Sequence, residues 1–415
     1  MLDPIARKLL DQHIRDTHFY HYDGWDSDPL DEHSGHPILS RHSSVLLNLD
    51  KHGEFVISHL QSIGVCAENI YHVRTDSLVG DHEISEYLAQ QSPRGGAARK
   101  RFSYFYAFYH QDLLPLNSTP ESVMLAVSPQ RQAFDKWNSK SRALDGLKLL
   151  GVKSPEAVSI ATHADAAYFI GLDPESSCIL KHSSQVPELV KTLEEVQEVW
   201  DEWQSSMVSQ ILDDVILERH IDTGPVMRTP NLTWLVPADR NAEPIFLFAT
   251  DQILKPGTLN HMGNVMPSAL SPDLLQKCKD AAAPILDDVR GIDSVIGIDY
   301  VFDVSDEVYV VDVNPRFNSC SFPGDAFSRL TDGRPDMVAV YTKIVAPREK
   351  FTNLSSLLEK LGDQIELFSK AAGCGIVAFG PMGHEYIDAF RVLSVGKSRG
   401  DSDKYIDQLR VALSD

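Results

Sequence analysis

Two aspartates and an asparagine near residue 300 have the types and the spacing of a magnesium site. Asp299 lies in the apolar segment 297–303, and Asp312 and Asn314 lie near the end of a second apolar segment, 308–314. The acidic turn between these segments predicts a β-hairpin that brings Asp299 alongside the other two. Asp312 and Asn314 are two residues apart on a strand, so both project from one face. Their oxygens are ligands of the kind that Mg²⁺, or Mn²⁺ in its place, prefers.

Three cationic side chains could hold a phosphate chain beside this metal. Arg316 follows the hairpin and could grip a phosphate with its bidentate guanidinium fork. Lys181 ends the apolar strand 178–180, and Lys140 lies in a predicted helical stretch, 130–150. The ordinary alternative for each lysine is a solvated surface side chain. Together with the hairpin, these residues predict the phosphate end of an Mg–ATP site.

A strand that continues into a polar linker supplies a candidate edge for adenine. Residues 215–217 predict a short buried strand. The residues after it could present backbone donors and acceptors to the base. The candidate ATP contacts in this linker are Glu218, Arg219, His220, Ile221 and Asp222.

In their order and spacing, these segments resemble the ATP-grasp superfamily of carboxylate–amine ligases. Such enzymes place a first lysine before a Gly-Val/Ile-x-x-Pro segment, as Lys140 precedes residues 151–155, and a second lysine at a strand end, as Lys181 does. Their adenine linker reads Val-x-Glu-x-x-Ile-x-Gly, and Glu218 and Ile221 match it. Their metal hairpin reads Gly-x-Asp-Phe/Tyr and then Glu/Asp-x-Asn-Pro-Arg, which is matched by Asp299, Asp312, Asn314 and Arg316.

The resemblance extends over about residues 123–320, and three features depart from the family pattern. No glycine-rich lid follows the second lysine, and Ser183 is the candidate to reach phosphate oxygens there. Pro225 stands where many members hold the ribose with a second glutamate, so Asp222 is the candidate substitute. Asp312 stands where glutamate is commoner, which shortens the metal arm by one methylene group.

The resemblance implies an ATP-dependent ligase. A substrate carboxylate would attack the γ-phosphate of ATP, and an amine would displace phosphate from the acyl phosphate to form an amide, with ADP and phosphate released. Arg316 would stabilise the transferring group. A polar loop, 261–267, would face the phosphates and the substrate through His261 and Asn264. The implied substrates are amino acids or small peptides, and the implied assembly is a homodimer.

Two other functions remain open at this point. One is an ATP-grasp enzyme that catalyses a different reaction, such as a carboxylase or a phosphotransferase. Biotin carboxylation is less favoured, because the chain has no biotinyl Met-Lys-Met segment. The other is a catalytically silent nucleotide-binding module, which the short lid favours.

The patterns predict a mixed α/β protein in three parts. Residues 1–128 alternate short strands with helices, as in a Rossmann-like domain with a parallel sheet. Residues 129–345 form the nucleotide-binding and catalytic domain, for which the resemblance implies antiparallel sheets with helices. Residues 346–415 form a small C-terminal α/β subdomain. The strands predicted are 45–49, 70–73, 123–127, 178–180, 215–217, 245–247 and 375–380, and the helices are 53–63, 130–150, 189–203, 272–290, 354–371 and 402–413.

Composition excludes several classes of protein. A formal net charge of −21 argues against a nucleic-acid partner, because such a chain repels a phosphate backbone. The five cysteines include no C-x-x-C pair, which argues against a disulfide framework or a zinc knuckle and favours a reducing cytoplasm. No apolar run approaches the roughly 18 residues of a membrane span. Histidines in the first 43 residues show H-x-x-H spacings, but packing or lining a substrate cleft is favoured over zinc.

Overall fold

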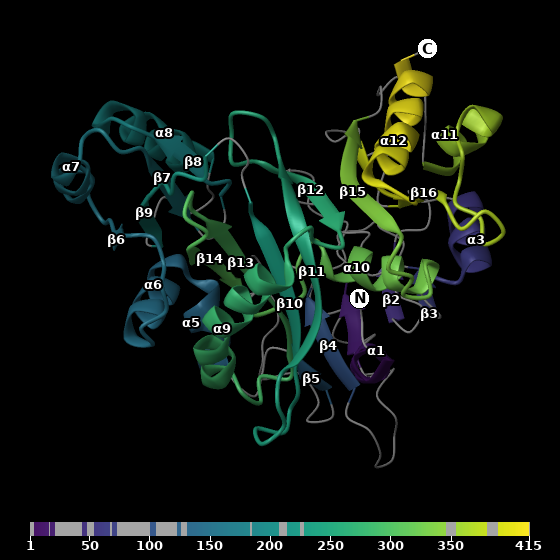
Figure 1. The fold of residues 1–415 in the computed structure, drawn as a ribbon, viewed down its shortest axis with the longest axis horizontal. Coiled ribbons are helices and arrows are strands. Elements are labelled where there is room, and N and C mark those ends of the chain that lie inside the picture. Colours follow the sequence, from purple (N-terminus) through teal and green to yellow (C-terminus); the bar gives the residue numbers. More distant parts are fainter. Residues whose placement is uncertain are drawn as a thin grey trace.

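The chain forms three β-sheets of five, eight and four strands, with helices packed against them. The computed structural model describes residues 4–15, 17–20, 44–47, 54–66, 69–72, 100–104, 123–125, 131–182, 185–206, 214–224, 228–345, 354–379 and 389–414. Figure 1 shows the four-stranded sheet with its helices at the upper left, the C-terminal helices at the upper right, and the five-stranded sheet below the centre. The mixed α/β class predicted from the sequence is confirmed.

The N-terminal part is a parallel sheet, as the alternating pattern predicts. All four strand pairings are parallel, in the order β3-β2-β1-β4-β5. The elements are α1 (Pro4–Arg15), β1 (Thr17–Tyr20), β2 (Ser44–Leu47), α3 (Glu54–Ile63), β3 (Asn69–His72), β4 (Lys100–Tyr104) and β5 (Val123–Leu125). Sequence analysis missed β1 and β4, because both are short and rich in polar residues. Pairing with neighbours on either side holds them in place.

The four-stranded sheet is antiparallel, in the order β6-β9-β7-β8. Its strands are β6 (Ala157–Ser159), β7 (Cys178–His182), β8 (Glu188–Val190) and β9 (Val215–Arg219), and it packs against α7 (His163–Leu172) and α8 (Leu193–Ser206). Trp200 and Trp203 of α8 are buried in its core. The helical stretch before this sheet is interrupted at Ser139, which separates α5 (Arg131–Asn138) from α6 (Lys140–Leu149). Ser139 is extended and its side chain accepts a hydrogen bond from the Arg142 backbone, so it caps α6.

The eight-stranded sheet is antiparallel throughout and has the order β14-β13-β10-β11-β12-β15-β17-β16. Its strands are β10 (Pro230–Val236), β11 (Ile245–Leu254), β12 (His261–Met266), β13 (Ser294–Phe302), β14 (Val308–Asn314), β15 (Val338–Val345), β16 (Gly375–Phe379) and β17 (Ala389–Gly396). Helix α9 (Pro272–Asp288) packs against the β10, β13 and β14 end. The sequence predicts a polar loop at 261–267, and this prediction is wrong, since β12 pairs on both edges.

The C-terminal segment extends this same sheet. β17 pairs with β15 and with β16, so the expected boundary at residue 345 falls between neighbouring strands of one sheet. The remaining elements are α10 (Ser321–Leu330), α11 (Leu354–Leu361), a short 3₁₀ helix (Gly362–Gln364) and α12 (Arg399–Ser414). The predicted helix 354–371 is too long, because Gly362 adopts φ +45° and the chain leaves the helix there.

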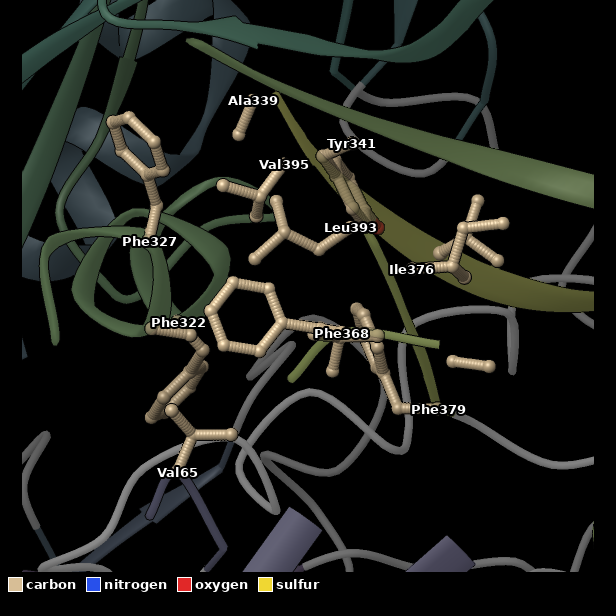
Figure 2. Close-up of a cluster of buried hydrophobic side chains, with 14 of the residues drawn as sticks. Val65, Phe322, Phe327, Ala339, Tyr341, Phe368, Ile376, Phe379, Leu393 and Val395 are labelled. Atoms are coloured by element: carbon tan, nitrogen blue, oxygen red, sulfur yellow. The ribbon is translucent and has the colours of Figure 1, made fainter. Parts of the chain in front are cut away.

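One hydrophobic core joins the two ends of the chain. It contains Ala6 of α1, Val56 of α3, Phe322 of α10 and side chains from β15, β16 and β17. Figure 2 shows Val65 and Phe322 gathered with Phe368, Tyr341 and Leu393 in this cluster. Arg329 of α10 also forms ion pairs with Asp11 of α1 and with Asp325. In the part of the chain described, no helix is long and apolar enough to cross a membrane.

Candidate active site

The β13–β14 hairpin places the three predicted metal ligands on one face of the eight-stranded sheet. Asp299 lies directly opposite Asp312, and Gly297 lies opposite Asn314. Asp299 accepts hydrogen bonds from Asn231 Nδ2 at 2.6 Å and from Gln252 Nε2 at 2.8 Å. A carboxylate held by two fixed amide donors keeps one orientation without a metal, so this arm of the site is preorganised.

The two carboxylates of the hairpin differ in their proton affinity. Burial, and then the neighbouring Asp312 charge, raises the pKa of Asp299 to about 6. Burial also acts to raise the pKa of Asp312, but the cations Lys140, Lys181 and Arg316 outweigh it, and the pKa is lowered. The hairpin therefore combines a carboxylate whose pKa the cations lower with one whose pKa is raised, although Lys140, Asn231 and Gln252 oppose that rise.

The donor set fits a hard cation that shares its coordination with a phosphate. Among the residues that the structure describes, no three His, Cys, Asp or Glu side chains cluster as a complete metal site. Two carboxylates are nevertheless what Mg²⁺ commonly takes from a protein, with water and substrate phosphates supplying the rest. Asn314 turns its Nδ2 toward Asp299 at 3.2 Å and toward Asp312 at 3.4 Å. Its amide would have to rotate by half a turn to offer an oxygen.

Lys140 reaches the hairpin from the first turn of α6. Its Nζ lies 2.6 Å from Asp312 Oδ1. Asp214 fixes that helix end, since it accepts hydrogen bonds from the backbones of Lys140 and Ser141 at 2.9 Å and from the Ser139 and Ser141 hydroxyls at 2.7 Å. Sequence analysis missed Asp214. Its only signal there is an acidic residue directly before the strand that begins at Val215.

Lys181 and Glu218 form an ion pair on the four-stranded sheet. Lys181 Nζ lies 2.7 Å from Glu218 Oε1, and the two side chains are 9% and 6% exposed. The same ammonium group donates to the Val311 carbonyl on β14 at 3.1 Å, so it joins the two antiparallel sheets. Burial raises the pKa of Glu218, and the Lys181 charge opposes that shift. Each of the two predicted lysines therefore contacts a carboxylate: Lys140 contacts Asp312, and Lys181 contacts Glu218.

The described side-chain hydrogen bonds of the predicted adenine linker are made to neighbouring protein groups. Arg219 donates to the carbonyls of Phe169 at 2.5 Å and Asp173 at 3.1 Å, so its side chain anchors α7. Its guanidinium also lies 4.3 Å from the Phe169 ring. Asp222 accepts from the Gly224 backbone at 2.9 Å, and burial lowers the pKa of His220. The contacts with ATP expected of residues 218–222, which include Ile221, remain predictions, and the backbone of this segment is the part that would contact adenine. Ser183 lies outside the described residues.

His261 and Asn264 lie on β12, on the same sheet face as the hairpin ligands. His261 Nε2 is 3.0 Å from Asn264 Oδ1, and Asn264 Nδ2 donates to Thr250 Oγ1 at 3.0 Å. Burial, with the Arg391 charge adding to it, lowers the pKa of His261 to about 4, so the imidazole is neutral at pH 7. His261 is thus a hydrogen-bonded side chain, and its contact with substrate stays a prediction.

Arg316 is buried beside the hairpin. It donates to Asn314 Oδ1 at 3.0 Å, to the Phe317 carbonyl at 3.3 Å and to Asn138 Oδ1 at 3.4 Å. Its charge also helps to lower the pKa of Asp312. Such a cation next to two carboxylates and two lysines suits the binding of a polyphosphate and a metal together.

Comparison with known proteins supports what this geometry indicates. A family model described as an ATP-grasp domain matches residues 237–320. The solved structure of an N5-carboxyaminoimidazole ribonucleotide synthetase (PurK) bound to ADP superposes with a TM-score of 0.60, at 10% sequence identity, and covers 95% of this chain and 96% of the other. The chain has the ATP-grasp fold.

Other solved structures with this fold have different activities. An L-amino acid ligase from Bacillus licheniformis has a TM-score of 0.56 at 10% identity, over 95% of this chain and 97% of the other. The biotin carboxylase domain of Hydrogenobacter thermophilus 2-oxoglutarate carboxylase, with MgADP and bicarbonate, has a TM-score of 0.59 at 12% identity, over 96% and 89%. A search of curated proteins finds no match. ATP and Mg²⁺ are the typical cofactors of ATP-grasp enzymes, which act as ligases or carboxylases.

Proposed function

We propose that this protein is an ATP- and Mg²⁺-dependent ligase that joins a carboxylate to an amine through an acyl phosphate. The observation that carries the proposal is the contact of Lys140 with Asp312 at 2.6 Å, which brings a cation from α6 onto the metal hairpin. A magnesium ion and a phosphate chain between these two groups would satisfy both charges at once. The ATP-grasp fold and the family match support the same conclusion.

Each charged group at the hairpin has a separate task in that reaction. Asp299 and Asp312 would hold Mg²⁺, which would supply charge neutralisation to the phosphate chain. Lys140 and Lys181 would exchange their carboxylate partners for phosphate oxygens. Arg316 would donate to the transferring phosphoryl group. Phosphoryl transfer needs mainly positioning and charge neutralisation, and these residues provide both.

Amino acids or small peptides are the substrates proposed for the chain. The structural likeness to an L-amino acid ligase supports this class. The likeness to PurK and to a biotin carboxylase favours a second candidate, the carboxylation of an amine with bicarbonate as the acid. In both reactions ATP activates a carboxylate as a mixed anhydride, so the hairpin serves either.

Release of ADP from the purified full-length chain tests the proposal. The chain is supplied with Mg²⁺ and ATP and with pairs of amino acids or short peptides, and a parallel series replaces the acid by bicarbonate. ADP formation that requires both an acid and an amine supports the ligase, and a requirement for bicarbonate supports the carboxylase. Nucleotide binding without turnover in either series would instead identify a silent module.

A further inference from the structure

Two buried polar side chains lie beside Asp299 on the neighbouring strand. Asn231 and Thr233 are two residues apart on β10, so both project from one face of the sheet, and Asn231 lies directly opposite Asp299 on β13. Asn231 is 3% exposed, and Thr233 is fully buried. Neither belongs to the proposed metal ligands or to the cations that would bind phosphate, yet hydrogen bonds connect both to the hairpin.

The hydrogen bonds of these two side chains run toward the metal hairpin. Thr233 Oγ1 donates to Asn231 Oδ1 at 3.0 Å, and Asn231 Nδ2 donates to Asp299 Oδ1 at 2.6 Å. An ionised carboxylate can only accept hydrogen bonds, so the amide nitrogen must face Asp299 and the amide oxygen must face Thr233. By donating to that oxygen, the Thr233 hydroxyl stabilises the one amide orientation that serves Asp299.

A second donor reaches Asn231 from the start of α10. Cys320, the residue before this helix, places its Sγ 3.2 Å from Asn231 Oδ1 and 3.0 Å from Asn318 Oδ1. A thiol is a weak donor with a single proton, so it serves one of these two oxygens at a time. Thr233 is therefore the stronger donor to Asn231, and the orientation of the amide depends mainly on its hydroxyl.

Gly297 leaves the space that this packing needs. It lies opposite Thr233 on the neighbouring strand, two residues before Asp299. A Cβ at this position would lie 1.9 Å from Asn318 Nδ2 and 3.1 Å from Asn231 Nδ2. A larger residue would therefore have to displace a buried amide, so the glycine, the asparagine and the threonine form one matched set.

The two oxygens of Asp299 have different surroundings as a result. Oδ1 accepts from Asn231 and also from Gln252 Nε2 at 2.8 Å, whereas Oδ2 faces Asn314 Nδ2 at 3.2 Å. Two amide donors on Oδ1 leave Oδ2 as the oxygen directed toward the other proposed ligands. We propose that Thr233 is a positioning residue for the metal, which acts through Asn231 to hold Asp299 Oδ2 toward the cation. This step rests on the proposed function, which supplies the cation.

Binding of Mn²⁺ to the full-length chain tests the proposal without turnover. The protein is saturated with a non-hydrolysable ATP analogue, Mn²⁺ is titrated in, and the free ion is quantified by electron paramagnetic resonance. Thr233→Val keeps the shape of the side chain and removes only its hydroxyl group. We expect it to raise the Kd of Mn²⁺ about tenfold, the lower end of the range for a lost partner of a metal ligand.

Further variants separate positioning from a general loss of stability. Thr233→Ser keeps the hydroxyl and should bind Mn²⁺ nearly as the wild type does. Asn231→Leu removes the amide itself and should raise the Kd further, up to about a hundredfold. Thr331→Val is the matched control, because Thr331 is also buried and its hydroxyl donates to the Phe327 carbonyl at 2.8 Å, at the far end of α10. It should lower the free energy of unfolding in urea without changing the Kd of Mn²⁺.

The two proposals can fail separately. If Thr233→Val loses stability as Thr331→Val does but binds Mn²⁺ as tightly as the wild type, Thr233 is purely structural and its positioning role is overturned, whatever the activity. Absence of Mn²⁺ binding in the wild-type complex with the analogue overturns it as well. Mn²⁺ binding that depends on Thr233, in a protein that releases no ADP with any acid and amine, overturns the ligase and leaves the positioning role standing.

Discussion

The two ends of the eight-stranded sheet both hold buried charge, but they arrange it in opposite ways. At the hairpin end, cations contact carboxylates, as in the pairs Lys140–Asp312 and Lys181–Glu218. At the β15–β17 end, the strand register sets Lys343 opposite Arg391. In the proposed function, the hairpin end would bind a metal and a phosphate by exchanging partners within the site. The β15–β17 end instead sets two cations side by side, and burial, followed by the Arg391 charge, lowers the pKa of Lys343 to about 8.

The largest expected effect tests the hairpin end of this comparison. Asp312→Asn removes a metal ligand and the partner of Lys140, and should lower kcat at least about a thousandfold, since metal and charge stabilisation contribute several kcal/mol. Steady-state ADP release measures it. Asp306→Asn, in the hairpin turn at φ +63°, is the control and should change kcat less than about threefold, because asparagine tolerates that conformation. Retained activity in Asp312→Asn would show that the hairpin does not hold the metal.

Removal of one partner from the buried ion pair should have a large effect on stability. Lys181→Met leaves Glu218 buried without its cation and should lower the free energy of unfolding by about 3–5 kcal/mol. Urea denaturation measures this. The double variant Lys181→Met/Glu218→Gln should regain most of the loss, because no uncompensated charge remains. If the double variant is as unstable as the single one, packing rather than charge accounts for the effect.

The lowered pKa of His261, which lies between the two ends of the sheet, predicts how the free energy of unfolding depends on pH. The pKa of His261 is about 4 in the folded state and 6.5 as its ordinary value. Between pH 4 and pH 6.5 the unfolded chain therefore binds the His261 proton more readily than the folded chain does. Stability should therefore fall as pH decreases from about 6.5, by about 2 kcal/mol at pH 5. Urea denaturation at both pH values, with His261→Gln for comparison, isolates this contribution. An equal loss in wild type and variant would place His261 in a more solvated setting.

A smaller effect sharpens the assignment of Asp214 as the residue that positions Lys140. Asp214→Ala removes the hydrogen bonds at the start of α6 and should lower stability by about 1–2 kcal/mol, in the range of a lost helix cap. The KM for ATP should rise more than kcat falls, because Lys140 is displaced but still present. Asp145→Ala, on the exposed side of the same helix, is the matched control. An unchanged KM in Asp214→Ala would make Asp214 a purely structural cap.

The β13–β14 hairpin could be predicted closely, because the residues that indicate it are close together in the sequence. Asp312, Asn314 and Arg316 follow one another along a few residues, and strand geometry alone places the first two on one face. The parallel N-terminal sheet was also predicted, since alternation of helix and strand favours it. The sequence predicts a loop at 261–267, which is wrong. Gly263 and its polar neighbours carry no alternating pattern, and only pairing with β11 and β15 makes most of this segment a strand.

The amino-acid sequence by itself determined the β13–β14 hairpin that carries the proposed metal ligands, and the class of fold, because each depends on residues close together in the chain. Only the tertiary structure decided which charges meet. Asp214 lies 74 residues from Lys140, and Lys140 lies 172 residues from Asp312. Lys343 and Arg391 became neighbours when β17 paired with β15. Strand order in a sheet is set by the packing of the whole core, and no local pattern of residues records it.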